Sequence, residues 1–318
     1  MKYINSRDFL FKDTAVTFGK FDGLHLGHRL LTEDIKRFKN EEVKNGRNIT
    51  TVLFTFDFSK SDCGFFVDRE YIFTMDEKIS IVEKLGIDVL IAYPFDRKAA
   101  DMKPDVFIND IIVSRLGARY IAAGSDFSFG LGAAGNVTLL EESSETFGYK
   151  LRVFDKLKLN NEIISSTIIR SKLKNGDVKT SMEMLGQAYF ISGKVTEGRR
   201  LGHTLGFPTL NLIPDNRKLM VKNGVYATRT FIEDGSKRAY SGMTNVGVRP
   251  TVGTQSEKWV ETNLFDFNGN LYGKTVRTEF LEFIREEIKF PTIDALRMQL
   301  LDDRKRIEDM EQRMVIHI

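Results

Sequence analysis

The sequence changes its rhythm near residue 186, and this change constrains the fold more than any other feature. Before it, short strand-like runs alternate with longer amphipathic segments of helical spacing. Such alternation predicts a parallel sheet with helices on both faces, and sheets of this kind bind ligands at the carboxyl ends of their strands. The predicted strands are residues 15–18, 49–56, 88–93 and 119–123, and the predicted helices are residues 26–43, 75–85 and 104–116.

Strand-like runs separated by turn residues dominate the rest of the chain, which predicts an antiparallel sheet or barrel. They are residues 188–195, 224–232, 238–246, 259–265 and 275–283. An amphipathic run at 292–310 predicts a final helix, and residues 165–186 predict a short helical connection. A chain of 318 residues is long enough for two cores. We therefore predict one domain over residues 1–186 and a second over residues 187–318.

The composition is that of an ordinary soluble globular protein, with 42% hydrophobic and 29% charged residues. A net charge of +3 is too small to indicate a nucleic-acid surface, but it suits anionic small ligands such as nucleotides. No run approaches the ~18 apolar residues of a membrane helix, and residues 1–8 do not resemble a signal peptide. The single cysteine, Cys63, excludes an intrachain disulfide and is interpreted as a packing or surface residue. These features favour a cytoplasmic protein without nucleic-acid or membrane partners, and they leave its oligomeric state open.

Two of the four histidines, His25 and His28, lie where the first predicted strand runs into a helix. Their spacing puts both on one helix face, and a helix N-terminus favours phosphate through its unpaired N–H groups and its dipole. Gly19, Gly23 and Gly27 allow the backbone to approach a ligand closely. Two imidazoles placed there can donate hydrogen bonds to a phosphorus centre as charge builds on its oxygens. The alternative is a pair of solvated surface histidines.

A second cluster lies at residues 164–170, where hydroxyl side chains precede an arginine by about one helical turn. Ser165, Ser166 and Thr167 followed by Arg170 suit the binding of a triphosphate. The alternative for the three hydroxyl residues is a plain helix N-cap.

These motifs carry a resemblance to a known family. The His-x-Gly-His pattern is similar to that of the nucleotidyltransferase superfamily, which includes the class I aminoacyl-tRNA synthetases. Residues 17–28, Thr-Phe-Gly-Lys-Phe-Asp-Gly-Leu-His-Leu-Gly-His, resemble more narrowly the bacterial FAD synthetases, as do residues 124–130 and 164–170. The resemblance implies a Rossmann-like α/β nucleotidyltransferase domain with catalytic His25 and His28. It assigns nucleotide or flavin binding to Gly19, Phe21, Asp22, Gly27, Asp126, Ser165, Ser166, Thr167 and Arg170.

The reaction implied by this resemblance is attack of the FMN phosphate on the α-phosphorus of ATP, with pyrophosphate leaving and Mg²⁺ accompanying the ATP. The chain departs from the family at two places. Residues 55–60 read Thr-Phe-Asp-Phe-Ser-Lys where relatives often have Pro-His-Pro, and the loop after Gly130 lacks the usual basic residue. The affinity for FMN, or the preferred redox state of the flavin, is therefore expected to differ from that of relatives.

A glycine-rich loop occupies residues 198–211 in the second half and contains Gly198, Gly202 and Gly206. Glycines let the backbone wrap phosphates, although no Gly-Lys-Ser/Thr follows, so the loop is not a Walker A motif. Thr209 and Asn211 place two oxygen ligands on one face of an extended segment, which suits Mg²⁺. The alternative is a turn-rich loop between strands.

Residues 198–211, ending in Gly-Phe-Pro-Thr-Leu-Asn, resemble the motif of riboflavin kinases, and residues 224–226, 245–251, 271–273 and 284–290 match that family in order. The resemblance implies a six-stranded antiparallel β-barrel with a C-terminal helix. It makes Glu261 the general base for the ribityl hydroxyl, Thr209 and Asn211 the metal ligands, and Gly198, Gly202, Gly206, Pro208 and Arg285 binding residues. Asn263 replaces the family's histidine, and His203 is interpreted as a loop residue without a catalytic role.

Together the two halves predict a bifunctional enzyme that phosphorylates riboflavin to FMN and adenylylates FMN to FAD, with ATP and Mg²⁺. One alternative keeps the fold with only the kinase active, the adenylyltransferase being weak or redox-dependent. A second is a flavin-sensing protein without turnover, and a third is an adenylyltransferase for another phosphate such as phosphopantetheine. The candidate base and imidazoles argue against the second alternative, and the kinase half argues against the third.

Overall fold

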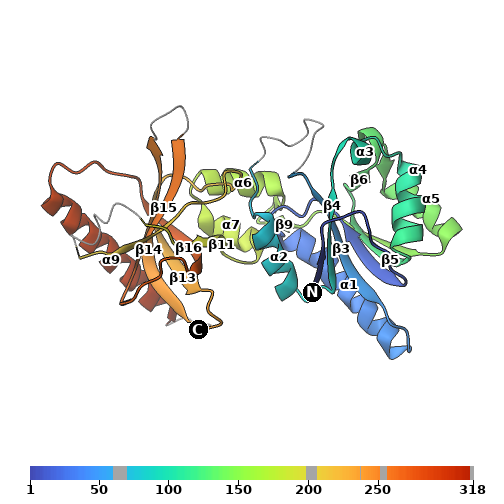
Figure 1. Ribbon diagram of the computed structural model, residues 1–318, viewed down its shortest axis with the longest axis horizontal. Coiled ribbons are helices and arrows are strands. Elements are labelled where there is room, and N and C mark those ends of the chain that lie inside the picture. Colours follow the sequence, from blue (N-terminus) through green and yellow to red (C-terminus); the bar gives the residue numbers. More distant parts are fainter. Residues whose placement is uncertain (60–69, 198–205, 237, 251–255, 316–318) are drawn as a thin grey trace. The chain divides into compact units, whose positions relative to one another are not determined.

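A computed structural model describes residues 1–59, 70–197, 206–236, 238–250 and 256–315. The chain divides into two compact units, Met1–Ser166 and Thr167–Ile318 (Figure 1). The connecting helices α6 (Ser166–Lys174) and α7 (Val178–Leu185) therefore belong almost wholly to the second unit. The functional boundary after residue 186 stays a prediction.

The first unit is built on a parallel sheet of six strands in the order β1-β4-β3-β2-β5-β8, so the predicted α/β class is confirmed. The central strand β2 pairs with β3 on one side and β5 on the other, which places the switch of strand order beside β2. Ligands bind at such a switch point in open parallel sheets. The strands are β1 (Lys2–Ile4), β2 (Thr14–Phe18), β3 (Thr50–Asp57), β4 (Val89–Pro94), β5 (Ala118–Gly124) and β8 (Lys150–Phe154).

Helices cover the middle of this sheet, where β2, β3 and β4 are buried along almost their whole length. The helix α1 (Leu26–Lys44) packs against β5, β2 and β3 through Leu31, Ile35 and Phe38. An aromatic and aliphatic core joins the strands to the segment 107–116, with Phe18 and Phe54 at its centre. The remaining elements are α2 (Met75–Lys84), α3 (Arg97–Ala100), α4 (Pro104–Val106), η1 (Phe107–Arg115), η2 (Leu131–Ala133) and α5 (Val137–Phe147), with the short strands β6 (Ser128–Phe129), β7 (Gly135–Asn136), β9 (Lys158–Leu159) and β10 (Glu162–Ile163).

The helix predicted at residues 104–116 differs from expectation, because most of it is the wider π-helix η1. The Leu116 N–H donates to the carbonyl of Ile111, five residues back. This winding directs the four buried side chains Phe107, Ile108, Ile111 and Ile112 into the core of the sheet. Apolar spacing alone does not distinguish such a helix from an α-helix.

The second unit contains an antiparallel sheet of six strands in the order β11-β16-β13-β14-β15-β12, as predicted. The sheet curls so that Thr196, just after β11, forms a bridge with Asn211 of the opposite edge strand β12. The Thr196 N–H donates to the Asn211 carbonyl over 2.9 Å. The strands are β11 (Tyr189–Lys194), β12 (Thr209–Leu212), β13 (Gly224–Ile232), β14 (Ala239–Pro250), β15 (Ser256–Leu264) and β16 (Thr275–Arg285).

The C-terminal helix α9 (Ile293–Val315) packs on this sheet, and Ile307 is fully buried among Ala227, Met243 and Ile284. Its presence confirms the predicted final helix. Among the described residues, no helix combines the length and the apolar character that crossing a membrane requires.

Candidate functional sites

The first candidate site begins at the carboxyl end of β2. The Gly19 N–H donates to the carbonyl of Phe54, which ties the end of β2 to β3. Three left-handed positions within four residues then turn the chain toward α1: Phe21 (φ 46°), Gly23 (φ 86°) and Leu24 (φ 45°). Left-handed backbone is costly for residues with a side chain, and Phe21 and Leu24 are both completely buried. Packing of these side chains holds the loop in a conformation that its backbone alone disfavours.

This loop brings His25 and His28 together as the spacing predicted. Their rings stack with centroids 3.7 Å apart and an interplanar angle of 16°. The Phe21 ring meets His28 edge-on at 5.0 Å. A Cβ at position 27 would lie 3.3 Å from the His25 ring, so Gly27 provides the space in which that ring lies.

Both imidazoles are neutral at physiological pH. Burial lowers the pKa of His25 to about 4, against the opposing effect of the Asp22 and Asp126 carboxylates. Burial holds the pKa of His28 well below its usual value, and repulsion from His25 in its protonated form and from the positive charge of Lys78 acts in the same direction. The Nδ1 atoms of both rings are buried and have no hydrogen-bond partner within the described part of the chain. Neutral rings at this position can donate hydrogen bonds to a phosphoryl group, but they bring no charge to it.

Asp22 fixes the loop rather than facing solvent. Its Oδ1 accepts a hydrogen bond of 2.9 Å from the N–H of Ile72, and its carbonyl accepts one of 2.7 Å from the Ser166 hydroxyl. The Ser166 side chain therefore joins the start of α6 to the histidine loop. Within the first unit, Ser166 is thus the residue of the predicted hydroxyl cluster that contacts the histidine loop.

Asp126 follows β5, across the switch point from the histidines. It is exposed, its carboxylate forms an ion pair of 2.9 Å with Lys156, and its charge is near enough to act on His25. The nearby Phe129 is a core residue. Ser165 is half-buried at the end of the same unit, whereas Thr167 and Arg170 belong to the second unit. The triphosphate role of these hydroxyls and of Arg170 stays a prediction.

The second candidate site lies on one face of the antiparallel sheet. Asn211 of β12 and Asn245 of β14 both stand directly opposite Glu261 of β15. Residues directly opposite one another in an antiparallel pair share a face. The Glu261 carboxylate accepts a hydrogen bond of 2.7 Å from the indole N–H of Trp259, which restricts its orientation.

A cavity of about 300 Å³ opens on this face. Thr209, Glu261 and Asn263 contribute polar atoms from neighbouring strands. Its other polar lining residues are Asn245, Arg285 and Glu287. The Asn263 amide donates a hydrogen bond of 2.8 Å to the carbonyl of Pro208, so it fixes the segment that leads into β12. The rest of the wall is mostly apolar and is formed by Phe207, Val225, Met243, Ile288, Phe290, Leu296 and Leu300.

A second cavity, of about 290 Å³, adjoins Thr209 and Pro208 and is otherwise lined from β12, β15 and the turn at residues 267–272. Thr209 borders both cavities. Ligands in the two cavities would therefore share Thr209 as a neighbour. Among the predicted glycines of the loop, Gly206 is exposed with a φ of 82°. Gly198, Gly202 and His203 lie outside the described residues.

Asn211 fits the role of a metal ligand. Its side chain is 3% exposed, and its Oδ1 has no hydrogen-bond partner among the described residues. A buried amide oxygen without a partner is costly and implies a ligand that the protein itself does not supply. Amide and hydroxyl oxygens suit Mg²⁺, which keeps several waters and substrate oxygens in its shell. The residues present therefore fit a magnesium ion held by Asn211 and Thr209.

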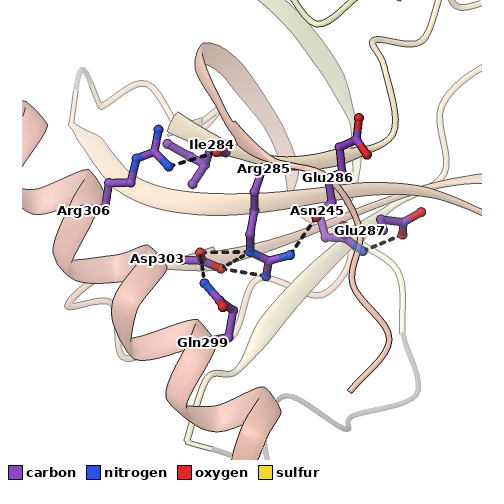
Figure 2. A network of polar contacts seen from close by, with 8 residues as sticks. All are labelled: Asn245, Ile284, Arg285, Glu286, Glu287, Gln299, Asp303 and Arg306. Carbon is purple, nitrogen blue, oxygen red and sulfur yellow. Dashed lines mark hydrogen bonds and ion pairs between the residues drawn. The ribbon is translucent and has the colours of Figure 1, made fainter. Parts of the chain in front are cut away.

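Arg285 borders the first cavity, but its guanidinium is engaged in a network on the side of α9 (Figure 2). It forms a bidentate pair with the buried Asp303 at 2.7 to 3.0 Å, and Gln299 donates to the same carboxylate over 3.0 Å. It also donates to the carbonyl of Glu286 over 2.9 Å. The network ties α9 to the end of β16 and so fixes the wall that Leu296 and Leu300 form.

Sequence reasoning missed three residues that shape these sites: Lys78, Trp259 and Asp303. Lys78 and Asp303 lie in segments that were assigned only as helix, whereas Trp259 directly precedes the segment that contains Glu261 and was not itself assigned a role. Their roles arise from partners that are distant in sequence, or from burial of a charge. The available signal for Lys78 and Asp303 was a charged residue at a position of an amphipathic helix that the structure buries. The hydrophobic periodicity of a helix does not reveal what such a charged residue contacts.

The two halves of the chain match two different protein families. The chain matches the FAD synthetase family model over residues 10–168 and the riboflavin kinase family model over residues 185–311. The bifunctional riboflavin kinase/FMN adenylyltransferase of Haemophilus influenzae is 35% identical over 292 residues, covering 91% of this chain and 91% of the relative. The chain belongs to the bifunctional riboflavin kinase/FMN adenylyltransferase family. Members of this family from Bacillus subtilis (32% identical, 92% of this chain and 90% of the relative) and Escherichia coli K12 (30% identical, 91% and 90%) carry the same name.

The resemblance inferred from the motifs is therefore confirmed. A crystal structure named as a macrolide-efflux protein from Streptococcus pneumoniae also matches, with a TM-score of 0.83 and 27% identity, covering 97% of this chain and 99% of that one. The match between the two structures extends over both units of this chain. The name of the Streptococcus protein describes that protein alone. The functional argument for this chain rests on the two family models.

Proposed function

We propose that the protein phosphorylates riboflavin to FMN in its second unit and adenylylates FMN to FAD through the histidine loop of its first unit, using ATP for both steps. The observation that carries this proposal is the presence of one separate constellation for each reaction within a chain that belongs to the family. The stacked neutral pair His25 and His28 suits phosphoryl chemistry without a covalent intermediate. The oriented carboxylate of Glu261 suits proton removal from an alcohol.

In the kinase step, the mostly apolar cavity takes the isoalloxazine ring and directs the ribityl chain toward Glu261. Glu261 then accepts the proton of the terminal hydroxyl as that oxygen attacks the γ-phosphorus of ATP. ATP enters from the second cavity, so that its phosphates meet the flavin at Thr209. Thr209 and Asn211 would hold Mg²⁺, which would neutralise part of the phosphate charge. The resemblance to riboflavin kinases assigns binding of those phosphates to the glycine-rich loop, of which Gly206 and Pro208 lie in the described part of the chain.

In the adenylylation step, the FMN phosphate attacks the α-phosphorus of ATP and pyrophosphate leaves. His25 and His28 donate hydrogen bonds to oxygens on which charge develops, and this stabilises the transition state. The loop residues Gly19, Phe21, Asp22 and Gly27 hold that geometry. Asp126, Ser165, Ser166, Thr167 and Arg170 act on the nucleotide. The domain boundary after residue 186, a cytoplasmic location and partners limited to small molecules are parts of the same proposal.

The direct test is product analysis. Purified protein with ATP and Mg²⁺ is supplied with riboflavin or with FMN, each oxidised or reduced, and the flavins are separated by chromatography. We expect FMN to appear before FAD from riboflavin, and FAD alone from FMN. Dependence of FAD on flavin reduction would trace to residues 55–60, where Pro-His-Pro is absent. FMN as the only product under every condition would limit the proposal to the kinase.

The proposed metal site makes its own prediction. Replacing Asn211 by leucine removes the unpaired oxygen and leaves the fold intact, because an unsatisfied buried polar atom is lost. We expect the Mg²⁺ concentration for half-maximal FMN formation to rise by roughly tenfold or more. Asn211→Asp, which keeps an oxygen at that position, is the matched control and should remain metal-dependent. An unchanged Mg²⁺ titration in a folded Asn211→Leu protein would remove Asn211 from the site.

A further inference from the structure

Lys78 is a buried lysine that the reactions described above do not yet use. It lies on α2 and is 6% exposed. Its Nζ donates a hydrogen bond of 2.9 Å to the carbonyl of Lys20, inside the loop that leads to the histidines. The Thr55 hydroxyl donates to the same carbonyl over 3.0 Å. This carbonyl is therefore held from two sides, by α2 and by β3.

The helix that carries Lys78 is firmly oriented at this end. Thr74 and Glu77 form a reciprocal capping box, in which the Thr74 hydroxyl accepts from the Glu77 N–H and the Glu77 carboxylate accepts from the Thr74 N–H. The Lys78 N–H donates to the Thr74 carbonyl, within the first turn of the same helix. The orientation of α2 therefore determines that the Lys78 side chain points toward the loop.

The electrostatic surroundings of Lys78 are unusual for a buried cation. No carboxylate lies within ion-pair distance of its Nζ in the part of the chain that the structure describes, although Asp22 and Asp57 are near enough to act on it. Burial lowers the pKa of Lys78 to about 8, and the charges of these two carboxylates oppose that effect. Burying an ammonium against a neutral carbonyl is costly, so packing alone does not account for a lysine here.

The charge also reaches the histidines. The positive charge of Lys78 adds to burial in lowering the pKa of His28 and so favours its neutral form. The carboxylate of Glu77, on the same helix, is occupied by the cap. The loop that must stabilise a developing negative charge therefore carries two uncharged rings, His25 and His28. The buried ammonium of Lys78 contacts this loop from α2.

We propose that Lys78 is a positioning residue for adenylyl transfer: its ammonium fixes the loop that carries His25 and His28 and brings to that loop the positive charge that the two neutral rings lack. This inference rests on the proposed adenylyltransferase function. It assigns to α2 a part in the reaction that no motif of the sequence indicates. Thr55 also holds the loop, through its hydrogen bond to the Lys20 carbonyl, but it brings no charge.

The test uses Lys78→Met, which removes the charge and keeps most of the volume, with Lys84→Met on the exposed side of the same helix as the matched control. We expect FAD formation from FMN to fall roughly 100-fold in Lys78→Met, because misplacement of reacting groups by about 1 Å costs this much. Kinase activity and the Lys84→Met protein should be unaffected. The melting temperature of Lys78→Met should be equal or higher, because a costly buried charge is gone. A lower melting temperature with unchanged adenylyl transfer would mean that Lys78 is only structural.

The pH profile separates the charge from the hydrogen bond. In the unaltered protein the rate of adenylyl transfer should decline as pH rises through about 8, because Lys78 loses its proton there. Lys78→Met should be slow and lack this decline, whereas Thr55→Val should be slower but keep it. A decline near pH 8 that persists in Lys78→Met would overturn the proposal.

One readout needs no turnover at all. In protein labelled at histidine nitrogen, the NMR titration of His28 should shift to higher pH in Lys78→Met, because a repelling cation has been removed. An unchanged His28 titration would contradict the proposed electrostatic role. Failure of the unaltered protein to form FAD would instead overturn the proposed function, and the titration would still decide the role of Lys78.

Discussion

Replacing Glu261 by glutamine is expected to lower the rate of FMN formation by roughly 10²- to 10⁴-fold, the range that a general base usually contributes. Glutamine has nearly the same shape, and its carbonyl oxygen can still accept the hydrogen bond from Trp259, so the sheet should not change. It cannot accept the proton of the ribityl hydroxyl. Single-turnover assays with riboflavin and ATP would measure the loss, and FAD formation from supplied FMN should continue at its normal rate.

A second carboxylate in the same cavity provides the control. Glu287 also lines the wall, but it follows β16 and is exposed. Its carboxylate accepts a long hydrogen bond of 3.4 Å from the side-chain amide of Asn245. Glu287→Gln should therefore lower FMN formation far less than Glu261→Gln. Equal losses in the two variants would mean that the charge of the cavity matters rather than a base at position 261. Loss of adenylyl transfer in folded Glu261→Gln would contradict the separation of the two sites.

Replacing His28 by alanine is expected to lower FAD formation from FMN by roughly 10²- to 10³-fold, the effect of removing one preorganised hydrogen-bond donor from a transition state. The ring is stacked on His25 and met edge-on by Phe21, so its loss also frees the neighbouring imidazole to move. The measurement is the rate of FAD formation at saturating ATP and FMN. Phosphorylation of riboflavin by the same sample reports on the integrity of the second unit and should be unaltered.

The controls for His28 follow from its neutral state. His28→Gln retains an N–H donor without a ring and should recover part of the lost rate if hydrogen bonding is the function of the imidazole. A glutamine variant no better than alanine, with unchanged affinity for both substrates, would indicate that the ring acts in another way. Loss of kinase activity in either variant would show that the domain assignment is wrong.

Much of the fold was predictable because each half has a clear hydrophobic pattern. The alternation in residues 15–123 predicted a parallel sheet, and β2, β3, β4 and β5 appear within a residue or two of their expected ends. The edge strands β1 and β8 were not predicted, since β1 is short and β8 is mostly exposed and lacks a continuous apolar run. The π-helix η1 was not predicted because its apolar spacing is compatible with an ordinary helix.

The sites were predictable where several chemical groups lie close in sequence. His25 and His28, or Thr209 and Asn211, are local pairs whose spacing already places them on one face. The contacts that orient them come from elsewhere: Lys78 reaches the loop from α2, and Asp303 holds Arg285 from α9. Such partners are fixed by tertiary packing, so a single sequence does not reveal them.

The central claim is that two separate sites in one chain perform consecutive reactions, and mixing two inactive variants tests it most directly. Glu261→Gln and His28→Ala are each supplied with riboflavin, ATP and Mg²⁺, first alone and then together, and FAD is measured. Alone, Glu261→Gln should yield almost no flavin nucleotide and His28→Ala only FMN. Together they should form FAD, because FMN made by one protein is a substrate for the other. Continued absence of FAD from the mixture, with FMN present, would contradict the account.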